Sequence, residues 1–182
     1  MALKQVLPGD KLPEQVNVII EIPSHSDPVK YEVCKDTGAL LVDRFMQTSM
    51  HYPCNYGFVP HTLCGDGDPV DVCVIMPVPL LPGSVIKCRP VGVLKMVDEG
   101  GEDAKIIAVP VSKVSGLYRK VSDVRDINEE TLDKISHFFE HYKDLEKGKW
   151  VKLEGWGGVE EAKKEILDSV KNFENAENKP NF

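Results

Sequence analysis

The order of strands and helices along the chain limits most strongly what it can fold into. From Val16 to about Pro110, short runs rich in β-branched residues are separated by Gly, Pro and Asp, a pattern typical of short strands joined by turns. The predicted strands span residues 16–22, 29–34, 39–45, 70–76, 84–97 and 105–109. Strands this short and this closely spaced favour a small barrel over an open parallel sheet. We therefore predict an α+β fold that is mainly β.

Helical periodicity begins only in the last third of the sequence. Over residues 128–145, apolar side chains recur at helical spacing, and Glu129 and Glu130 occupy the first turn, where negative charge suits the helix dipole. A second amphipathic helix is predicted over residues 159–173. Residues 175–182 lack periodicity and are predicted to form a loose C-terminal tail.

Length and charge narrow the class of protein. A chain of 182 residues suits one domain, which we assign to residues 1–174, because domains usually contain roughly 100 to 200 residues. With 22 Lys and Arg against 29 Asp and Glu, the formal net charge is -7. Binding a nucleic-acid backbone requires a basic surface, so this acidic balance argues against nucleic acid as a partner.

No segment predicts a membrane span, and the cysteines indicate a reducing compartment. The longest weakly polar run, residues 70–81, contains Asp71 and prolines and is shorter than the roughly 20 apolar residues that a span needs. Pro8 and Gly9 interrupt the place where a secretory signal would have its apolar core. The 5 cysteines are odd in number and lack C-x-x-C spacing, which fits neither a disulfide framework nor a zinc knuckle. We therefore expect a cytoplasmic protein with reduced thiols and no membrane partner.

The segment D-G-D-P-V-D at residues 66–71 concentrates carboxylates beside a predicted strand. Asp66, Asp68 and Asp71 would repel one another unless cations neutralised them, and hard oxygen ligands suit Mg²⁺, Mn²⁺ or Ca²⁺. A D-G pair alone is most often a solvated turn. An EF-hand loop is excluded, because its sixth position would be Asp71 instead of Gly and its twelfth would be Pro77 instead of Glu.

A second acidic cluster follows the predicted strand that ends at Val97. Two such clusters at strand ends of one small barrel favour a shared multi-metal site over two charged turns. Basic and phenolic side chains accompany the carboxylates, and together they describe a site for metal ions and a small, highly charged anion. The second cluster consists of Asp98, Glu99, Glu102 and Asp103, and the accompanying residues are Lys30, Arg44, Tyr52, Tyr56, Lys105, Tyr142 and Lys143, with Glu32 on the strand face of Lys30.

Several motifs resemble those of the family I soluble inorganic pyrophosphatases, in the order in which that family has them. The most specific is D-G-D-P-V-D-V at residues 66–72. The resemblance extends from about Leu12 to Phe173. It implies hydrolysis of inorganic pyrophosphate to two phosphates, an OB-like five-stranded barrel flanked by the two C-terminal helices, and a bacterial-type homohexamer. The other motifs are K-Y-E (30–32), D-R-F (43–45), Y-P-C-N-Y-G (52–57), C-R-P-V-G-V-L-K-M-V-D-E (88–99), E-D-A-K (102–105) and F-F-E-H-Y-K-D-L-E (138–146).

The resemblance also implies roles for individual side chains. Asp68 would be the catalytic base near the attacking water. Several Mg²⁺ ions per active site, which Mn²⁺ or Zn²⁺ could replace, would be held by Glu21, Asp66, Asp71, Asp98 and Asp103. The phosphates would be bound by Lys30, Arg44, Tyr56, Lys105, Tyr142 and Lys143, while Glu32, Tyr52 and Glu99 would support the site. Such a set suits phosphoryl transfer, which depends on positioning and on electrostatic stabilisation.

Two other functions compete with this interpretation. Residues 137–141 read H-F-F-E-H, the H-x-x-E-H pattern with which some peptidases bind zinc, but that site needs a third ligand and leaves both acidic clusters unexplained. Small OB-type barrels also bind oligonucleotides, although strand ends rich in Asp argue against this function. The sequence leaves open whether Cys73, on the same strand face as Asp71, borders the site or is a small buried hydrophobe.

Overall fold

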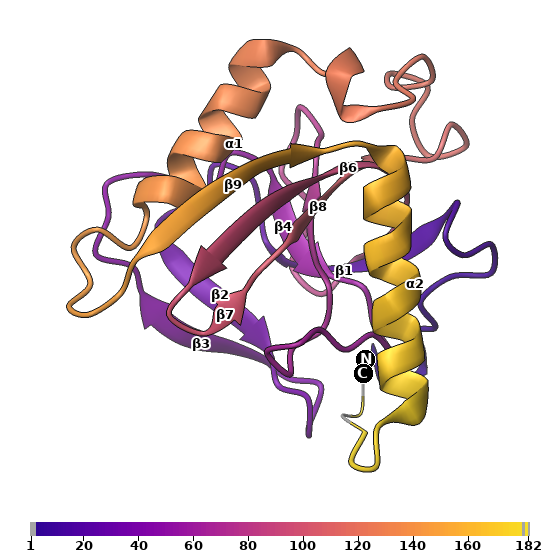
Figure 1. The fold of residues 1–182 in the computed structure, drawn as a ribbon, viewed down its shortest axis with the longest axis horizontal. Helices are drawn as coiled ribbons and strands as arrows, with labels where there is room; N and C mark the ends of the chain where they lie inside the picture. Colours follow the sequence, from indigo (N-terminus) through magenta and orange to yellow (C-terminus); the bar gives the residue numbers. More distant parts are fainter. Residues whose placement is uncertain (1–2, 180, 182) are drawn as a thin grey trace.

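Five strands close into a ring in the computed structural model, which describes residues 3–179 and residue 181 (Figure 1). Hydrogen-bonded neighbours follow the order β1–β4–β5–β8–β6, and β6 pairs back with β1. Only β5 and β8 pair in parallel within this ring. The mainly β, OB-like fold confirms the predicted fold class. The ring strands are β1 (Val16–Ile22), β4 (Asn55–Phe58), β5 (Asp71–Val74), β6 (Val85–Asp98) and β8 (Lys105–Pro110).

Further strands extend or flank the ring. β7 (Gly101–Glu102) and β9 (Val151–Gly157) pair with the long strand β6. β2 (Val29–Val33) and β3 (Leu40–Phe45) form a separate two-stranded sheet. Single-turn 3₁₀ helices, η1 (Leu3–Gln5) and η2 (Val124–Asp126), precede β1 and α1 respectively.

The ring is not built from all of the strands predicted from the sequence. The predicted strands at 29–34 and 39–45 form the separate hairpin instead, and β4 supplies the missing ring member. β4 has only 4 residues and is buried throughout, so it shows no alternation of polar and apolar residues. Gly57 within it lies so close to β1 that an added Cβ would be 1.9 Å from the Ile19 carbonyl oxygen. A side chain at this position would therefore separate the two strands.

Both predicted helices are present, with shifted ends. α1 (Glu129–His141) begins after Asn128, whose side-chain oxygen accepts a hydrogen bond from the Glu130 amide. It ends earlier than predicted, and Leu145, the last residue of the predicted helix, is 70% exposed. α2 (Val159–Asn175) includes one residue of the predicted tail, and residues 176–179 contain no helix or strand. The remainder of the predicted tail includes residues 180 and 182, which lie outside the described residues.

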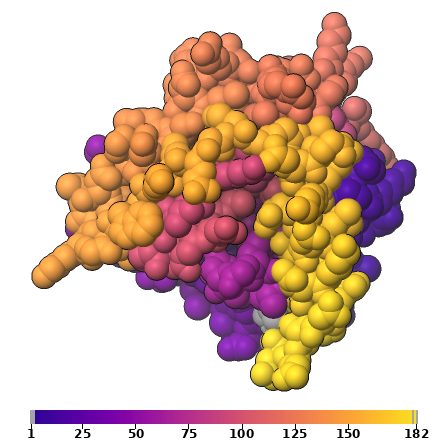
Figure 2. Space-filling model, in the orientation of Figure 1, coloured from indigo at the N-terminus to yellow at the C-terminus, as the bar shows by residue number. Residues whose placement is uncertain are grey.

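The helices cover the two faces of the sheet. On one face, Ile135, Phe138 and Phe139 of α1 pack with strand residues that include Cys73. On the other, Ala162 and Ile166 of α2 pack against a group of strand residues rich in valine, and α2 forms one edge of the surface in Figure 2. Because strand residues alternate between faces, both helices are held by the same sheet. Within the described residues, no helix has the length and apolarity needed to cross a membrane.

Candidate active site

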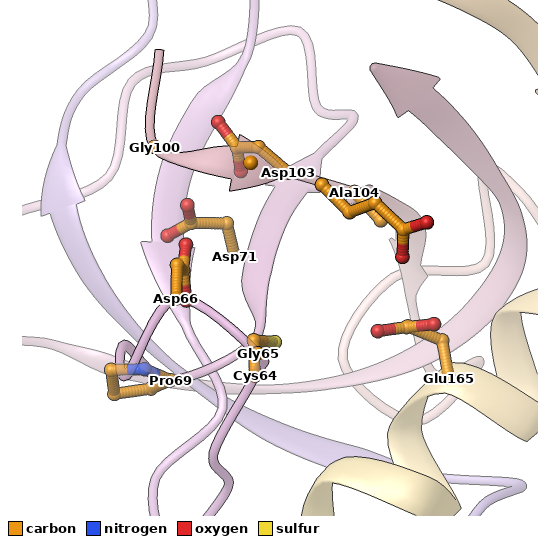
Figure 3. A pocket seen from close by; sticks show the side chains of 11 residues that line it. Cys64, Gly65, Asp66, Pro69, Asp71, Gly100, Asp103, Ala104 and Glu165 are labelled. Carbon is orange, nitrogen blue, oxygen red and sulfur yellow. The ribbon is translucent and has the colours of Figure 1, made fainter. Parts of the chain in front are cut away.

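The strand pairing brings the two acidic clusters to one end of the ring. Asp71 is the first residue of β5 and lies opposite Lys105, the first residue of the parallel strand β8. β6 runs antiparallel to β8, so its last residue, Asp98, reaches the same end. Figure 3 shows a pocket that Asp66, Asp71 and Asp103 line from the strand ends, while Glu165 reaches it from α2. Segments about 30 residues apart in the sequence are thereby joined in one site.

Lys105 lies at the centre of this group of charges. Its side chain is 4% exposed, and Nζ lies 2.6 Å from Asp71 Oδ2 and 2.5 Å from Asp103 Oδ1. Burial opposes the charge on this ammonium, but Asp71 and Asp103 outweigh burial and hold its pKa well above the usual value. Lys105 is therefore a permanently charged group at the floor of the site.

The segment after α1 supplies a second buried cation. Lys143 Nζ lies 2.6 Å from Asp98 Oδ2 and 3.5 Å from Glu99 Oε1. Burial raises the pKa of Asp98, but the hydrogen bonds from Lys143 and the Gly100 amide, together with the charges of Lys143 and Lys105, more than offset burial and lower this pKa. Lys149, which sequence reasoning missed, lies 3.6 Å from Glu99 Oε1 through its Nζ. With its pKa lowered, Asp98 stays ionised at the end of β6.

The hairpin of β2 and β3 brings two more cations to the site. Lys30 and Arg44 are paired across the hairpin, and their Nζ and Nη1 atoms lie 3.5 Å and 3.2 Å from Asp43 Oδ2. Lys30 also lies 3.7 Å from Glu32, as expected for residues on one strand face. The Lys30 and Arg44 side chains both line a cavity of the site, so the hairpin forms part of its wall.

Nearly all of the predicted site residues line one cavity of about 330 Å³. Glu21 and Glu32 are the exceptions, and they line an adjoining cavity of about 80 Å³. The two cavities share Lys30, Tyr56, Asp68 and Asp71, so the structure brings the complete predicted set together. Gly100 and Lys149 also line the larger cavity, which is bounded by Lys30, Arg44, Tyr52, Tyr56, Asp66, Asp68, Asp71, Asp98, Glu99, Asp103, Lys105, Tyr142 and Lys143.

Tyrosine side chains of the site belong to an aromatic cluster. Tyr52 and Tyr56 have ring centroids 5.0 Å apart, and Tyr142 stacks on Phe138 at 5.1 Å. Burial raises the pKa of both Tyr52 and Tyr56 well above the usual value. The phenols therefore stay protonated and are suited to donate hydrogen bonds to an anion.

Several carboxylates of the site carry raised pKa values. Burial raises the pKa of Asp66, Asp68 and Asp103, and the charge of Asp71 adds to each of these shifts. Burial also raises the pKa of Glu21 to about 7, although its Oε1 accepts a 2.7 Å hydrogen bond from the Val33 amide. The arrangement thus gathers mutually repelling carboxylates at positions that are only partly desolvated, and a bound cation would relieve their repulsion.

The donor set fits hard divalent cations. It consists of carboxylate oxygens, the ligands that Mg²⁺ and Mn²⁺ prefer. Among the described residues, no group of three or more Asp, Glu, His or Cys side chains is yet arranged to hold an ion. Lys105 instead neutralises Asp71 and Asp103, so these carboxylates would have to reorient to bind one.

The H-x-x-E-H segment does not form a zinc centre with described residues. The His137 and His141 rings lie 4.7 Å apart on α1, and His141 Nδ1 lies 2.9 Å from Asp144 Oδ2. No third ligand completes a metal-binding group in the described part of the chain. The histidines therefore carry no sign of peptidase chemistry.

Cys73 is a buried neighbour of the site. Its exposure is 0%, and it packs with Tyr52 and Tyr56 in the cluster covered by α1. Burial raises the pKa of its thiol well above the usual value. A hydrophobic role accounts for this residue, and no lining of the two cavities includes it.

Comparison with known proteins decides between the interpretations. Residues 18–174 match the family described as inorganic pyrophosphatase. The chain belongs to the inorganic pyrophosphatase family. It is 62% identical to the inorganic pyrophosphatase of Escherichia coli (strain K12) over 179 residues, which cover 98% of this chain and 100% of the relative. Identity to the inorganic pyrophosphatase of Xanthomonas campestris pv. campestris is 58% over 173 residues, covering 95% and 97% of the two chains.

Solved pyrophosphatase structures have the same fold. The inorganic pyrophosphatase of Thermus thermophilus superposes with a TM-score of 0.90 at 42% identity, covering 96% of this chain and 100% of the other. A structure described as an inorganic phosphatase from Anaplasma phagocytophilum gives a TM-score of 0.92 at 50% identity, covering 94% and 100%. The chain is therefore a hydrolase of this metal-dependent family, and neither the zinc peptidase nor the nucleic-acid-binding alternative is supported.

Proposed function

We propose that this chain hydrolyses inorganic pyrophosphate to two phosphates with several Mg²⁺ ions in the cavity between the ring and the hairpin of β2 and β3. The observation that carries the proposal is the single cavity in which cations, phenols and carboxylates meet. Cations and phenols match the oxygens of a phosphate, while the carboxylates match the metal ions that accompany it.

The cationic side chains bind the substrate. Lys30 and Arg44 approach from the hairpin, and Lys105 and Lys143 from the ring and the end of α1. With the protonated phenols of Tyr56 and Tyr142, they neutralise charge on the phosphate oxygens as the bond between the phosphates breaks. Their placement on separate elements lets them surround a compact anion.

The carboxylates divide into metal ligands and a base. Glu21, Asp66, Asp71, Asp98 and Asp103 are the proposed ligands, and Mn²⁺ or Zn²⁺ are proposed substitutes for Mg²⁺. When bound, the cations lower the pKa of water and neutralise phosphate oxygens. Asp68, which lines both cavities, accepts a proton from the attacking water. The pKa of Asp68 is raised, so this carboxylate accepts a proton more readily than an ordinary aspartate does.

Three further residues support the site. Glu32 lies near Lys30, and Glu99 lies near Lys143 and Lys149. The Tyr52 ring packs against the Tyr56 ring. Each holds a substrate-binding side chain in place without itself binding the substrate.

The proposal also covers the domain boundaries, the oligomeric state and the cellular location of the protein. We place the catalytic domain at residues 1–174, in a homohexamer in the cytoplasm. The 5 cysteines are all free, which suits a reducing compartment. Exposed apolar side chains on β3, including Val42 and Phe45 at 55% and 75% exposure, suit a surface that associates with other subunits.

Phosphate release from pyrophosphate tests the reaction and its metal requirement. We expect turnover with Mg²⁺, loss of turnover after chelation, and recovery when Mg²⁺ is restored. Full activity in metal-free buffer would contradict the proposal. Sedimentation measurements test the hexamer independently of activity.

A further inference from the structure

The side chain of Arg44 meets a carboxylate that neither acidic cluster contains. Glu146 Oε1 lies 3.4 Å from Arg44 Nε, and the Glu146 side chain is 10% exposed. Both atoms are buried, and neither makes a hydrogen bond of normal geometry within the described residues. A buried carboxylate and a guanidinium edge thus face each other at slightly more than hydrogen-bonding distance, a spacing that can tighten when a ligand binds.

Two main-chain hydrogen bonds fold the segment that carries Glu146. The Glu146 amide donates a 2.8 Å hydrogen bond to the Lys143 carbonyl, and the Lys149 amide donates a 3.2 Å bond to the Glu146 carbonyl. One tight segment after α1 therefore carries Tyr142 and Lys143 into the cavity and places Glu146 beside the hairpin. Arg44 belongs to that hairpin, which is otherwise separate from the ring sheet.

A chain of alternating charges connects Arg44 with Lys143. Glu146 Oε2 lies 3.8 Å from Lys149 Nζ, which lies 3.6 Å from Glu99 Oε1. Glu99 in turn lies 3.5 Å from Lys143 Nζ. The two proposed phosphate-binding cations are thus held at opposite ends of one network, in which Glu146 is the member that contacts Arg44.

The contact leaves part of the guanidinium free for a ligand. Glu146 faces the Nε edge, and Asp43 lies 3.2 Å from Nη1. The guanidinium has five N–H donors in a rigid plane, so fixing one edge orients the others. We propose that Glu146 is a positioning residue, which holds Arg44 so that its remaining N–H groups face the substrate. This inference rests on the proposed role of Arg44 in substrate binding.

The direction of the effect on KM separates positioning from the electric field alone. Glu146→Gln removes a negative charge near an anion site, which by charge alone would favour the substrate and lower KM. Loss of positioning has the opposite effect. We therefore expect Glu146→Gln to raise KM for Mg-pyrophosphate by roughly 5- to 10-fold, with an unchanged thermal midpoint. Glu130→Gln is the matched control, because Glu130 pairs with Lys134 on the exposed surface of α1.

A double-mutant cycle with Arg44→Ala tests whether Glu146 acts through Arg44. Arg44→Ala alone should raise KM, and adding Glu146→Gln should then leave KM unchanged or lower it. If KM rose on Glu146→Gln in both backgrounds, or if this variant behaved like Glu130→Gln, the positioning role would be overturned. Wild-type KM in Arg44→Ala would instead refute the proposed role of Arg44 itself. Should Glu146→Gln lose thermal stability, Glu146→Asp takes its place in the cycle. It keeps the charge but shortens the reach to Arg44, so KM should rise in the wild-type background and stay unchanged in the Arg44→Ala background.

Discussion

Lys105 shows how a single side chain sets the charge balance of the site. Its ammonium lies between Asp71 and Asp103, two proposed metal ligands, and neutralises part of their charge. A carboxylate shared between a buried lysine and a metal ion has no substitute, because an amide of the same shape carries no charge for either partner. Asp71 is therefore the residue at which the proposed chemistry is most sensitive to a single change.

Replacing Asp71 by Asn should lower kcat/KM for pyrophosphate by at least about 100-fold, the scale seen when one preorganised electrostatic contact is lost. It should also raise the Mg²⁺ concentration needed for half-maximal rate. Phosphate release measured across a Mg²⁺ titration checks both effects. Asp133→Asn is the control, because Asp133 is exposed on α1. Wild-type rate and wild-type Mg²⁺ dependence in the Asp71 variant would show that the metal assignment is wrong.

The cysteines should differ sharply in reactivity. A hydrogen bond with Thr37 lowers the pKa of Cys34, which is partly exposed, so its thiolate forms more readily. Cys73 and Cys88 are buried, and burial raises the pKa of both. We expect a maleimide to label Cys34 first in the native protein and to leave Cys73 unlabelled until unfolding. Mass spectrometry of labelled peptides checks the order, and Cys34→Ser should remove the fast phase. Early labelling of Cys73 would contradict its buried position.

At the scale of elements, the sequence predicted those with a clear periodic pattern and missed the short, fully buried strand. Both helices could be predicted, because their apolar residues recur at helical spacing over several turns. β4 could not, since a fully buried strand of 4 residues shows no alternation. β9 does alternate, with Val151 and Leu153 less exposed than Lys152 and Glu154, and this signal could have identified it.

The same contrast applies to the candidate site. The order of the motifs along the sequence indicated which residues belong to one site. The structure explains why they meet, because most of them lie at strand ends that border one cavity. Lys149 and Glu146 were missed because their partners lie far away in the sequence, on the hairpin and after β6. Only the closed ring and the segment after α1 bring these groups together. Tertiary contacts of this kind leave no local periodicity to read.

Asp123 links η2 with the first turn of α2 and should matter for stability. Its Oδ1 accepts hydrogen bonds from Arg125, and its Oδ2 accepts a 2.9 Å bond from the Val159 amide at the start of α2. Asp123→Ala should lower the free energy of unfolding by about 2 kcal/mol, because a helix cap and a charged hydrogen bond are lost together. Denaturant unfolding checks this value. Asp133→Ala, an exposed change on α1, should have little effect.

The stabilising effect of the Asp123 carboxylate should depend on pH. The hydrogen bond from Arg125 holds the pKa of Asp123 well below its usual value. A lowered folded-state pKa contributes stability that is fully present above the unfolded pKa of about 3.9 and is lost as pH falls below it. The difference in stability between wild type and Asp123→Ala should therefore shrink as pH is lowered from 6 toward 3. A difference that stays constant with pH would rule out a contribution from the ionised carboxylate.

At the scale of the whole molecule, the site works against the stability of the fold. Carboxylates from β1, β5, β6 and their loops are gathered at one end of the ring, and several have raised pKa values because burial and mutual repulsion disfavour their charge. Lys105 and Lys143 offset only part of this repulsion. A ligand that binds the folded chain and neutralises these groups should therefore stabilise it by mass action.

Mg²⁺ should raise the thermal midpoint even without substrate. At a concentration about 100 times its dissociation constant, a single bound ion adds roughly 2.7 kcal/mol, which corresponds to roughly 5–10 °C for a chain of this size. Scanning fluorimetry with Mg²⁺, with a chelator, and with NaCl at matched ionic strength checks the shift and removes general salt effects. Asp71→Asn should reduce the shift, because Asp71 is a proposed ligand of the ion and an uncharged amide binds a cation less tightly. A midpoint that responds equally to Mg²⁺ and to NaCl would mean that the carboxylates bind no ion in the folded protein.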